Sequence, residues 1–317
     1  AAAGRSFAEQ RAFLGAMRAR FTDVAADHPY AWFPERATAD ELATVTPKNR
    51  LTAEPYTKRM NAFPNVDQGS ALLVTSLAAA REAGLEDQAI FVWSGASTAE
   101  VRHPAARPHL GSSPAIAAAA RRVFEAAGVG VDDISRFDFY SCFPIAVEAG
   151  AEAVGITVDD PRGLTVTGGL PYFGGPGNNY VGHSIATMVE LLRETPGLGL
   201  CTALGGFITK HAIGIYGTEP PPRGFRAGDT AADQQAIDAS AIEVTTQAEG
   251  EALVEGATVV PTADGTGVES APVIARLDDG RRIVAVADPA ALPDLAGRCL
   301  GGERVQVTGG PPPVYRI

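Results

Sequence analysis

The chain has 317 residues, 45% of them apolar and 20% charged, which is enough apolar material for a core and argues against disorder. Its 37 acidic and 26 basic residues give a net charge of −11, which disfavours attraction to a nucleic-acid backbone. Three scattered cysteines without a Cys-x-x-Cys pair indicate neither a disulfide framework nor a metal site, so we expect a cytoplasmic location. No apolar run approaches the ~20 residues of a membrane span. The sequence lacks a signal peptide and a starting Met, so we expect a processed chain or one that begins inside a longer gene product.

Residues 1–60 are predicted to form a helix followed by a proline-rich segment. Phe7, Leu14, Met17 and Phe21 recur at roughly helical spacing, and a second short helix is expected near residues 39–43. The prolines that follow the first helix argue against long regular elements. Because the segment carries aromatic residues but no sheet of its own, we expect it to pack on another part of the chain.

Residues 61–217 alternate between predicted strands and helices. Short apolar runs at 70–76 and 89–93 are typical of strands buried on both faces. Further strands are expected at 137–140, 164–167, 198–203 and 207–216, and helices at 114–127, 144–154 and 184–193. Gly205-Gly206 between the last two strands indicates a hairpin. This order predicts a layered α/β domain with a mixed sheet.

Residues 218–235 are predicted to be a linker, and residues 236–317 a small antiparallel β-barrel. Strands with a period of two are expected at 252–260, 270–277, 281–287 and 304–308, with a turn at Asp278-Asp279-Gly280. Aromatic residues are too few here for a base-stacking groove, so we expect the barrel to dock on the α/β domain.

Three segments that follow predicted strands could carry chemistry. They are Tyr140-Ser141-Cys142-Phe143, a glycine-rich loop from Gly168 that ends in Gly182-His183, and the hairpin Cys201-Thr202-Ala203-Leu204-Gly205-Gly206. The loop has neither the Walker pattern nor the dinucleotide spacing of glycines. Each feature alone also has a structural explanation, namely a turn, a packed histidine or a small buried thiol. Their occurrence together, in this order, predicts a site.

These three segments resemble motifs in the C-terminal half of the thiolase superfamily, especially its sterol-carrier-protein-type and actinobacterial thiolase-like branches. The turn at 140–143 is similar to the family's Asn-Glu-Ala-Phe or His-Asp-Cys-Phe motif, Gly182-His183 to its Gly-His motif, and residues 202–206 to its Cys-x-Gly-Gly hairpin. The resemblance covers residues 1–217, with 1–60 resembling the loop domain over the coenzyme A site. Residues 236–317 resemble an appended oligonucleotide/oligosaccharide-type (OB-like) barrel.

The resemblance implies an acyl-CoA acyltransferase of the acetyl-CoA acetyltransferase type, acting in lipid metabolism. In that reading His183 and the backbone amides of Leu204, Gly205 and Gly206 stabilise an oxyanion. Candidate catalytic residues beside His183 are Tyr140, Thr202, Cys201 and Cys142.

This sequence departs from the family pattern at three points. The family's nucleophilic cysteine belongs to an N-terminal half that this sequence does not contain. Thr202 stands where thiolases carry their acid/base cysteine, and Cys201, one residue earlier in a strand, should face the opposite side. Tyr140 stands where Asn or His would orient a water molecule.

Two alternatives to acyl transfer follow from these departures. One is a thiolase-like aldolase that cleaves a β-hydroxyacyl-CoA, and the other is a catalytically silent CoA-binding or scaffold protein. Both enzymatic hypotheses predict that Tyr140 and His183 face one cavity while Cys201 does not.

The expected partners are an acyl-CoA substrate and a second protein layer. A single half of this fold would expose an apolar face, so we expect either the N-terminal thiolase half or a second thiolase-type subunit to cover it, in a homo- or hetero-oligomer. Lys58, Arg59 and Arg107 are candidate contacts for the CoA phosphates. No permanently bound cofactor and no metal are expected.

Overall fold

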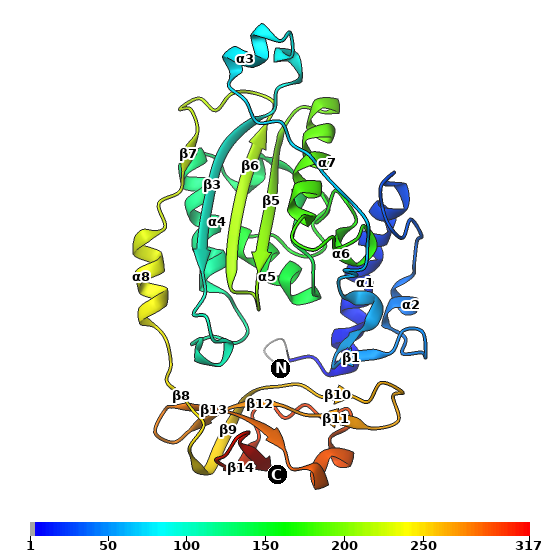
Figure 1. Ribbon diagram of the computed structural model, residues 1–317, viewed down its shortest axis with the longest axis vertical. Helices are drawn as coiled ribbons and strands as arrows, with labels where there is room; N and C mark the ends of the chain where they lie inside the picture. The colour runs from blue at the N-terminus through cyan, green and yellow to red at the C-terminus, as the bar shows by residue number, and fades with distance from the viewer. Residues whose placement is uncertain (1–3) are drawn as a thin grey trace.

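The computed structural model describes residues 4–317, so residues 1–3 of the predicted N-terminal segment lie outside the described part (Figure 1). The chain begins with helix α1 (Phe7–Asp27), whose N-cap Ser6 and Glu9 form a reciprocal capping box. The short helix α2 (Ala39–Ala43) follows, as predicted. The rest of this segment consists of β1 (Leu51–Ala53), β2 (Tyr56–Thr57) and the 3-10 turn η1 (Lys58–Met60).

The α/β domain is built on one mixed five-stranded sheet, which confirms the predicted fold class. In spatial order its strands are β4 (Ile134–Asp138), β5 (Leu198–Gly205), β6 (Lys210–Gly217), β3 (Phe91–Ala99) and β7 (Arg226–Ala227). The outer pairs β4–β5 and β3–β7 are parallel, and the inner pairs are antiparallel.

Helices cover the two faces of this sheet unequally. Helices α4 (Pro114–Ala127) and α5 (Pro144–Val154) share the main core with Leu200 of β5, and both have the bounds predicted from the sequence. Helix α7 (Tyr180–Glu194) packs on the other face, against Cys201. Because successive strand residues point to opposite faces, these neighbouring positions identify the two sides of the sheet. The remaining short elements are α3 (Leu77–Glu82), η2 (Glu86–Gln88), η3 (Pro104–Ala106), η4 (Val131–Asp133) and α6 (Gly169–Tyr172).

Two predicted strands are absent from the sheets of residues 4–317. Residues 164–167 form bends whose backbone instead contacts the end of β4, where Phe139 N donates to Leu164 O at 3.0 Å. Residues 70–76 are not helical and belong to no strand ladder, and Leu73 and Val74 are 85% and 84% exposed. The prediction of a buried strand at 70–76 is therefore wrong for this chain. Its sequence favours a strand, but the domain offers no neighbour with which it can pair.

The C-terminal region forms the predicted small barrel, drawn below the sheet in Figure 1. Five strands close on one another in the order β9 (Glu249–Ala257), β12 (Val273–Leu277), β13 (Arg282–Ala287), β15 (Val314–Arg316) and β14 (Arg304–Thr308). The pairs β14–β9 and β12–β13 complete the closure. The pairs in the ring are antiparallel, as predicted, except β13–β15, which is parallel. Associated elements are β8 (Val244–Thr245), β10 (Val260–Pro261), β11 (Val268–Ser270) and the 3-10 segment η5 (Pro289–Leu295).

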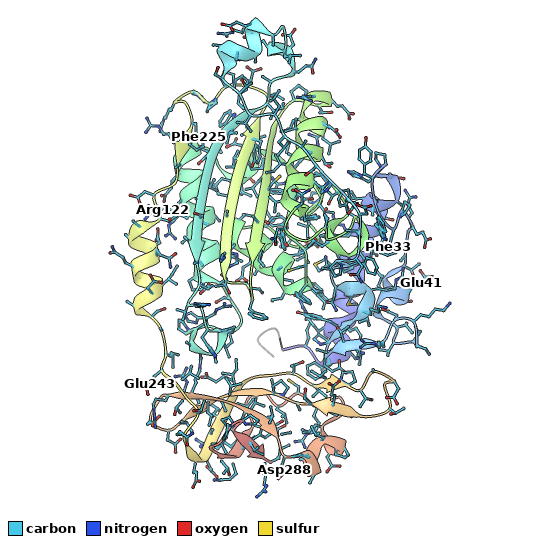
Figure 2. All side chains as sticks on the ribbon, in the orientation of Figure 1. Phe33, Glu41, Arg122, Phe225, Glu243 and Asp288 are labelled. Atoms are coloured by element: carbon cyan, nitrogen blue, oxygen red, sulfur yellow. The ribbon has the colours of Figure 1, made fainter. Side chains whose placement is uncertain are left out.

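The predicted linker is more ordered than expected. It contains β7 and the start of helix α8 (Ala231–Ala239), which contacts α4 and β3 before the chain enters the barrel. Figure 2 shows Arg122 of α4 facing α8, where its guanidinium is paired with Asp233 at 2.7 Å. The connection between the two parts therefore follows the outer edge of the sheet.

Candidate functional site

The turn at 140–143 follows β4 and is held by hydrogen bonds from several segments. They are Tyr140 N to Thr202 Oγ1 (2.7 Å), Arg18 Nη2 to Ser141 O (2.8 Å), Leu170 N to Ser141 Oγ (3.1 Å) and Ala62 N to Cys142 O (2.8 Å). The donors and acceptors come from α1, the N-terminal loop, α6 and β5. The Thr202 hydroxyl is therefore occupied in positioning the backbone of Tyr140.

A first cavity of about 930 Å³ lies beside this turn, between the β5–β6 hairpin, the end of β3 and the starts of α7 and α8. Three predicted site residues line it, namely Tyr140, Leu204 and Gly205. Gly206 belongs to the hairpin turn and is not part of the lining. The lining also includes polar residues that the sequence analysis did not select, namely Asn178, Lys210, His211 and Gln234.

The Tyr140 hydroxyl stays protonated in this setting. Burial raises the pKa of Tyr140 above its ordinary value of 10.0. A neutral phenol is a hydrogen-bond donor, so Tyr140 can donate to an oxygen that gains negative charge in the first cavity.

His183 lines a different cavity from Tyr140, so the prediction that the two share one is wrong. The second cavity, of about 500 Å³, is lined by His183, His28, Tyr30 and Trp32, among others. The reason is the start of α7, which is one turn earlier than predicted. His183 therefore lies on the helix face of Ala186, Thr187 and Glu190, which all line the second cavity, whereas Val181 faces the first.

Two fully buried rings separate His183 from Tyr140. The ring of Tyr180 lies 5.5 Å from that of Tyr140, and the ring of Phe173 lies 6.3 Å from Tyr180 and 5.2 Å from His183. Burial lowers the pKa of His183 below 6.5, and its Nε2 has no hydrogen-bond partner among residues 4–317. His183 is thus a neutral imidazole outside the first cavity.

Its neighbour His28 has both ring nitrogens engaged. His28 Nδ1 accepts from Tyr30 N at 3.2 Å, which leaves Nε2 to donate to Thr187 Oγ1 at 3.1 Å. Burial, and secondarily the nearby His183, lower the pKa of His28. The second cavity therefore holds two neutral imidazoles, and its lining also includes the acidic residues Asp67 and Glu190.

His211 is the histidine of the first cavity, and sequence reasoning missed it. It is buried at the start of β6, paired in register with Leu204. Its Nε2 lies 3.2 Å from Ile208 O, and since a carbonyl only accepts, Nε2 carries the proton and Nδ1 is left as a proton acceptor. Burial lowers the pKa of His211 below 6.5, so the ring is neutral near pH 7. The sequence signal that could have identified His211 as a site residue is its position five residues after Gly206, on the second strand of the predicted hairpin.

The cysteines do not provide a thiolate in the first cavity. Cys201 is buried against Met188 and Leu192 of α7, on the face of β5 opposite to Thr202, as the register argument predicted. Burial raises the pKa of both Cys201 and Cys142, and neither lines the first cavity. Cys299 lies in the barrel region and is exposed.

The three basic residues proposed for CoA phosphates lie on different elements. Lys58 and Arg59 are exposed in η1. Arg107 is mostly buried beside the hairpin, where its guanidinium donates to Val101 O and to Thr209 Oγ1, both at 3.0 Å. Arg107 therefore already has structural partners, whereas Lys58 and Arg59 are free to meet a ligand from solvent.

Asp138, a buried acidic residue at the end of β4, stabilises the arrangement around the turn at 140–143 through hydrogen bonds. It accepts hydrogen bonds from Val166 N (2.9 Å), Thr165 Oγ1 (2.9 Å) and Tyr180 Oη (3.0 Å). These bonds link the end of β4 to residues 165–166, just before the glycine-rich loop, and to the first residue of α7.

Within residues 4–317, no group of three His, Cys, Asp or Glu side chains is arranged to hold a metal ion. No helix in the same part of the chain is long and apolar enough to cross a membrane.

Comparison with known proteins gives two informative structural matches. A monomeric SCP2-thiolase-like protein type 1 (STLP1) from Mycobacterium smegmatis is 36% identical, with a TM-score of 0.91 over 99% of this chain and 69% of that one. An Ltp2–ChsH2(DUF35) aldolase is 19% identical, with a TM-score of 0.55 over 68% of this chain and 59% of that one. No family model and no curated protein matches the sequence.

Proposed function

Since the chain belongs to the SCP2-thiolase-like family, we propose that it acts on coenzyme A thioesters in the first cavity, by cleaving a β-hydroxyacyl-CoA without a cysteine nucleophile. One observation carries this proposal. The cavity of about 930 Å³ is lined by Tyr140 and His211, while Cys142 and Cys201 do not line it. Acyl transfer through a covalent thioester would need a thiolate there, which neither Cys142 nor Cys201 supplies, so that reaction would require a cysteine from outside this sequence.

In the proposed reaction, His211 Nδ1 takes the proton from the β-hydroxyl group of the substrate. The Cα–Cβ bond then breaks, the β-carbon becomes a carbonyl, and the electron pair passes to the thioester enolate. The neutral Tyr140 hydroxyl donates to the enolate oxygen, which is where charge develops. The proton on His211 returns to the α-carbon, so the products are a carbonyl compound and a shortened acyl-CoA.

The name of the second structural match supports the choice between reactions. That protein is described as an aldolase with a DUF35 partner, although its 19% identity establishes only a common fold. Exposed Lys58 and Arg59 are the proposed contacts for the CoA phosphates. The three free cysteines fit the cytoplasmic location proposed from the sequence.

The test is release of the shortened acyl-CoA from a β-hydroxyacyl-CoA, followed chromatographically, with Tyr140→Phe as the variant. Loss of one oxyanion donor is expected to lower kcat by about 10²–10³. The matched control is Tyr30→Phe, an exposed tyrosine of the second cavity, which should keep its rate. Thioester binding without any turnover by the unsubstituted protein would instead identify a catalytically silent CoA-binding protein and refute the proposal.

A further inference from the structure

Ile208, in the turn between β5 and β6 (Figure 1), has an unusual backbone conformation. Among residues 4–317 it is the only residue other than glycine with a positive φ, at +51°. A β-branched side chain in the left-handed region crowds the backbone and costs free energy. Such a conformation persists only where surrounding contacts fix it, and it is most frequent at functional sites.

The carbonyl oxygen of this strained residue faces His211 of the first cavity. Ile208 O lies 3.2 Å from His211 Nε2 and accepts its N–H. A hydrogen bond of this kind selects the tautomer, because it keeps the proton on Nε2 and leaves Nδ1 free to accept one. The position of a single carbonyl group therefore decides whether His211 can act as the base of the proposed reaction.

Three hydrogen bonds to Thr209 hold the turn in this conformation. Thr209 N donates to Gly205 O at 3.1 Å, and Thr209 O accepts from Glu100 N at 2.7 Å. The Thr209 hydroxyl Oγ1 accepts from Arg107 Nη2 at 3.0 Å. The Ile208 carbonyl and the Thr209 N–H belong to one planar peptide unit, so contacts that fix Thr209 also fix the direction of that carbonyl.

Of these three bonds, only the one from Arg107 joins two side chains. Arg107 is itself well fixed, because its Nε donates to Val101 O at 3.0 Å and its carbonyl oxygen accepts from Arg282 of β13. Hydrogen bonds from an ionised donor are stronger than those between neutral groups. Neither Arg107 nor Thr209 lines the first cavity, so their effect on a substrate there has to pass through another residue.

We propose that Arg107 is a positioning residue for His211 and acts through Thr209. Its guanidinium holds the turn so that the strained Ile208 carbonyl faces His211 Nε2. Without this bond the turn relaxes toward an ordinary φ, the carbonyl turns away, and the ring also populates the tautomer with the proton on Nδ1. The effect on turnover rests on the proposed function, whereas the effect on the tautomer can be measured without a substrate.

The first measurement is the tautomer of His211, by ¹⁵N NMR of the full chain with labelled histidine and with His211→Gln to assign the signals. We expect the Nε2–H tautomer in the unsubstituted protein and a mixture of both in Thr209→Val and in Arg107→Gln. Thr209→Ser keeps a hydroxyl at this position, so it should retain the single tautomer.

Thr218→Val is the matched control, because Thr218 is also partly buried and its Oγ1 also accepts a hydrogen bond, from Gly197 N at 3.3 Å. It lies just after β6, at the opposite end of the β5–β6 pair from the turn. This variant should have the tautomer and the turnover of the unsubstituted protein.

The second measurement is turnover of a β-hydroxyacyl-CoA. Thr209→Val and Arg107→Gln should each lower kcat by about 10- to 100-fold and leave KM within about twofold, since the base is misplaced while the cavity lining is unchanged. Because both substitutions remove the same bond, the variant that carries both should have a kcat within about twofold of that of Arg107→Gln.

The proposal is overturned if Thr209→Val keeps the single Nε2–H tautomer, or if it raises KM and leaves kcat unchanged. An equal effect of Thr218→Val would also overturn it, because the loss would then not be specific to the turn. A chain without any turnover whose His211 tautomer still changes in Thr209→Val and Arg107→Gln would refute the proposed function, while supporting the control of His211 by Arg107.

Discussion

The reaction proposed for the first cavity depends on the protonation states of two residues, Tyr140 and His211. Burial raises the pKa of Tyr140 and lowers that of His211, so both are neutral near pH 7. The two shifts separate a hydrogen-bond donor from a proton acceptor, which is the division of roles that enolate chemistry needs. The presence of a histidine in the sequence does not by itself identify the proton acceptor of the first cavity, because burial also makes His183 neutral in the second cavity.

The pH dependence of kcat/KM should report His211. Only the neutral ring accepts a proton, so the rate should rise with pH and reach a plateau, with a midpoint below 6.5. No fall is expected up to pH 9, because the pKa of Tyr140 lies above 10.0. Rates measured from pH 5 to 9 test this. In His211→Gln, the remaining kcat/KM should no longer fall at acidic pH. If kcat/KM of this variant still falls at acidic pH as before, the group that ionises is not His211.

At the scale of elements, much of the α/β domain could be predicted from the sequence. Helices α4 and α5 have the predicted bounds because each has Pro in its first turn and a glycine in the left-handed conformation at its end, Gly128 and Gly155. The β5–β6 hairpin and the opposite facing of Cys201 and Thr202 were also predictable, since they follow from turn chemistry and from strand alternation.

The errors concern information that is not local. The N-cap of α7 makes no side-chain hydrogen bond, so no capping signal identified Tyr180 as the first helical residue. Because the helix start was predicted too late, the direction in which His183 faces was also predicted wrongly. Residues 70–76 have the pattern of a strand, but a strand also needs a neighbour, which a local pattern cannot supply. His211 was missed because its role depends on Ile208 and on the cavity wall, not on a motif.

The junction of the glycine-rich loop with α1 should be sensitive to one added methyl group. Gly169 has a φ of +76°, and a Cβ there would lie 2.7 Å from the ring of Phe21 and close to Ser141 Oγ. Gly169→Ala should therefore lower the free energy of unfolding by about 2–4 kcal/mol, from backbone strain plus overpacking. The measurement is urea unfolding.

Gly163→Ala is the control, because Gly163 has a similar φ of +80° but no atom within 4 Å of an added Cβ. The free energy of unfolding of this variant should fall by the cost of backbone strain alone, about 1–2 kcal/mol. Equal losses in the two variants would mean that the contact with α1 is not tight.

In the molecule as a whole, a buried guanidinium is one of the contacts that join the barrel to the α/β domain. Arg282 of β13 is almost fully buried and donates to the carbonyl oxygens of Ala105 (3.0 Å) and Arg107 in the η3 region. Its Nε also pairs with Glu255 at 2.6 Å. A second contact joins β1 to the barrel, since Glu54 N donates to Val259 O at 2.9 Å. These contacts join the barrel to the η3 region and to the N-terminal segment.

Arg282→Ala should loosen the barrel. It removes one of the two arginines that pair with Glu255 and leaves buried carbonyls unpaired, so we expect a loss of about 1–3 kcal/mol and faster proteolytic cleavage between residues 217 and 230. Arg304→Ala, which removes an exposed arginine paired with Glu251, should change stability by less than about 1 kcal/mol. Limited proteolysis and urea unfolding measure both. A variant Arg282→Ala as stable as Arg304→Ala would show that the buried contacts do not hold the barrel.

We propose that Tyr140 and His211, rather than a thiol of this chain, carry the reaction on a CoA thioester. The most direct measurement compares turnover of a β-hydroxyacyl-CoA by the unsubstituted protein, by Tyr140→Phe, and by the variant carrying Cys142→Ala with Cys201→Ala. We expect the cysteine variant to keep its kcat within about threefold, while kcat of Tyr140→Phe falls by about 10²–10³. Turnover that survives Tyr140→Phe but disappears with the two cysteines would contradict it.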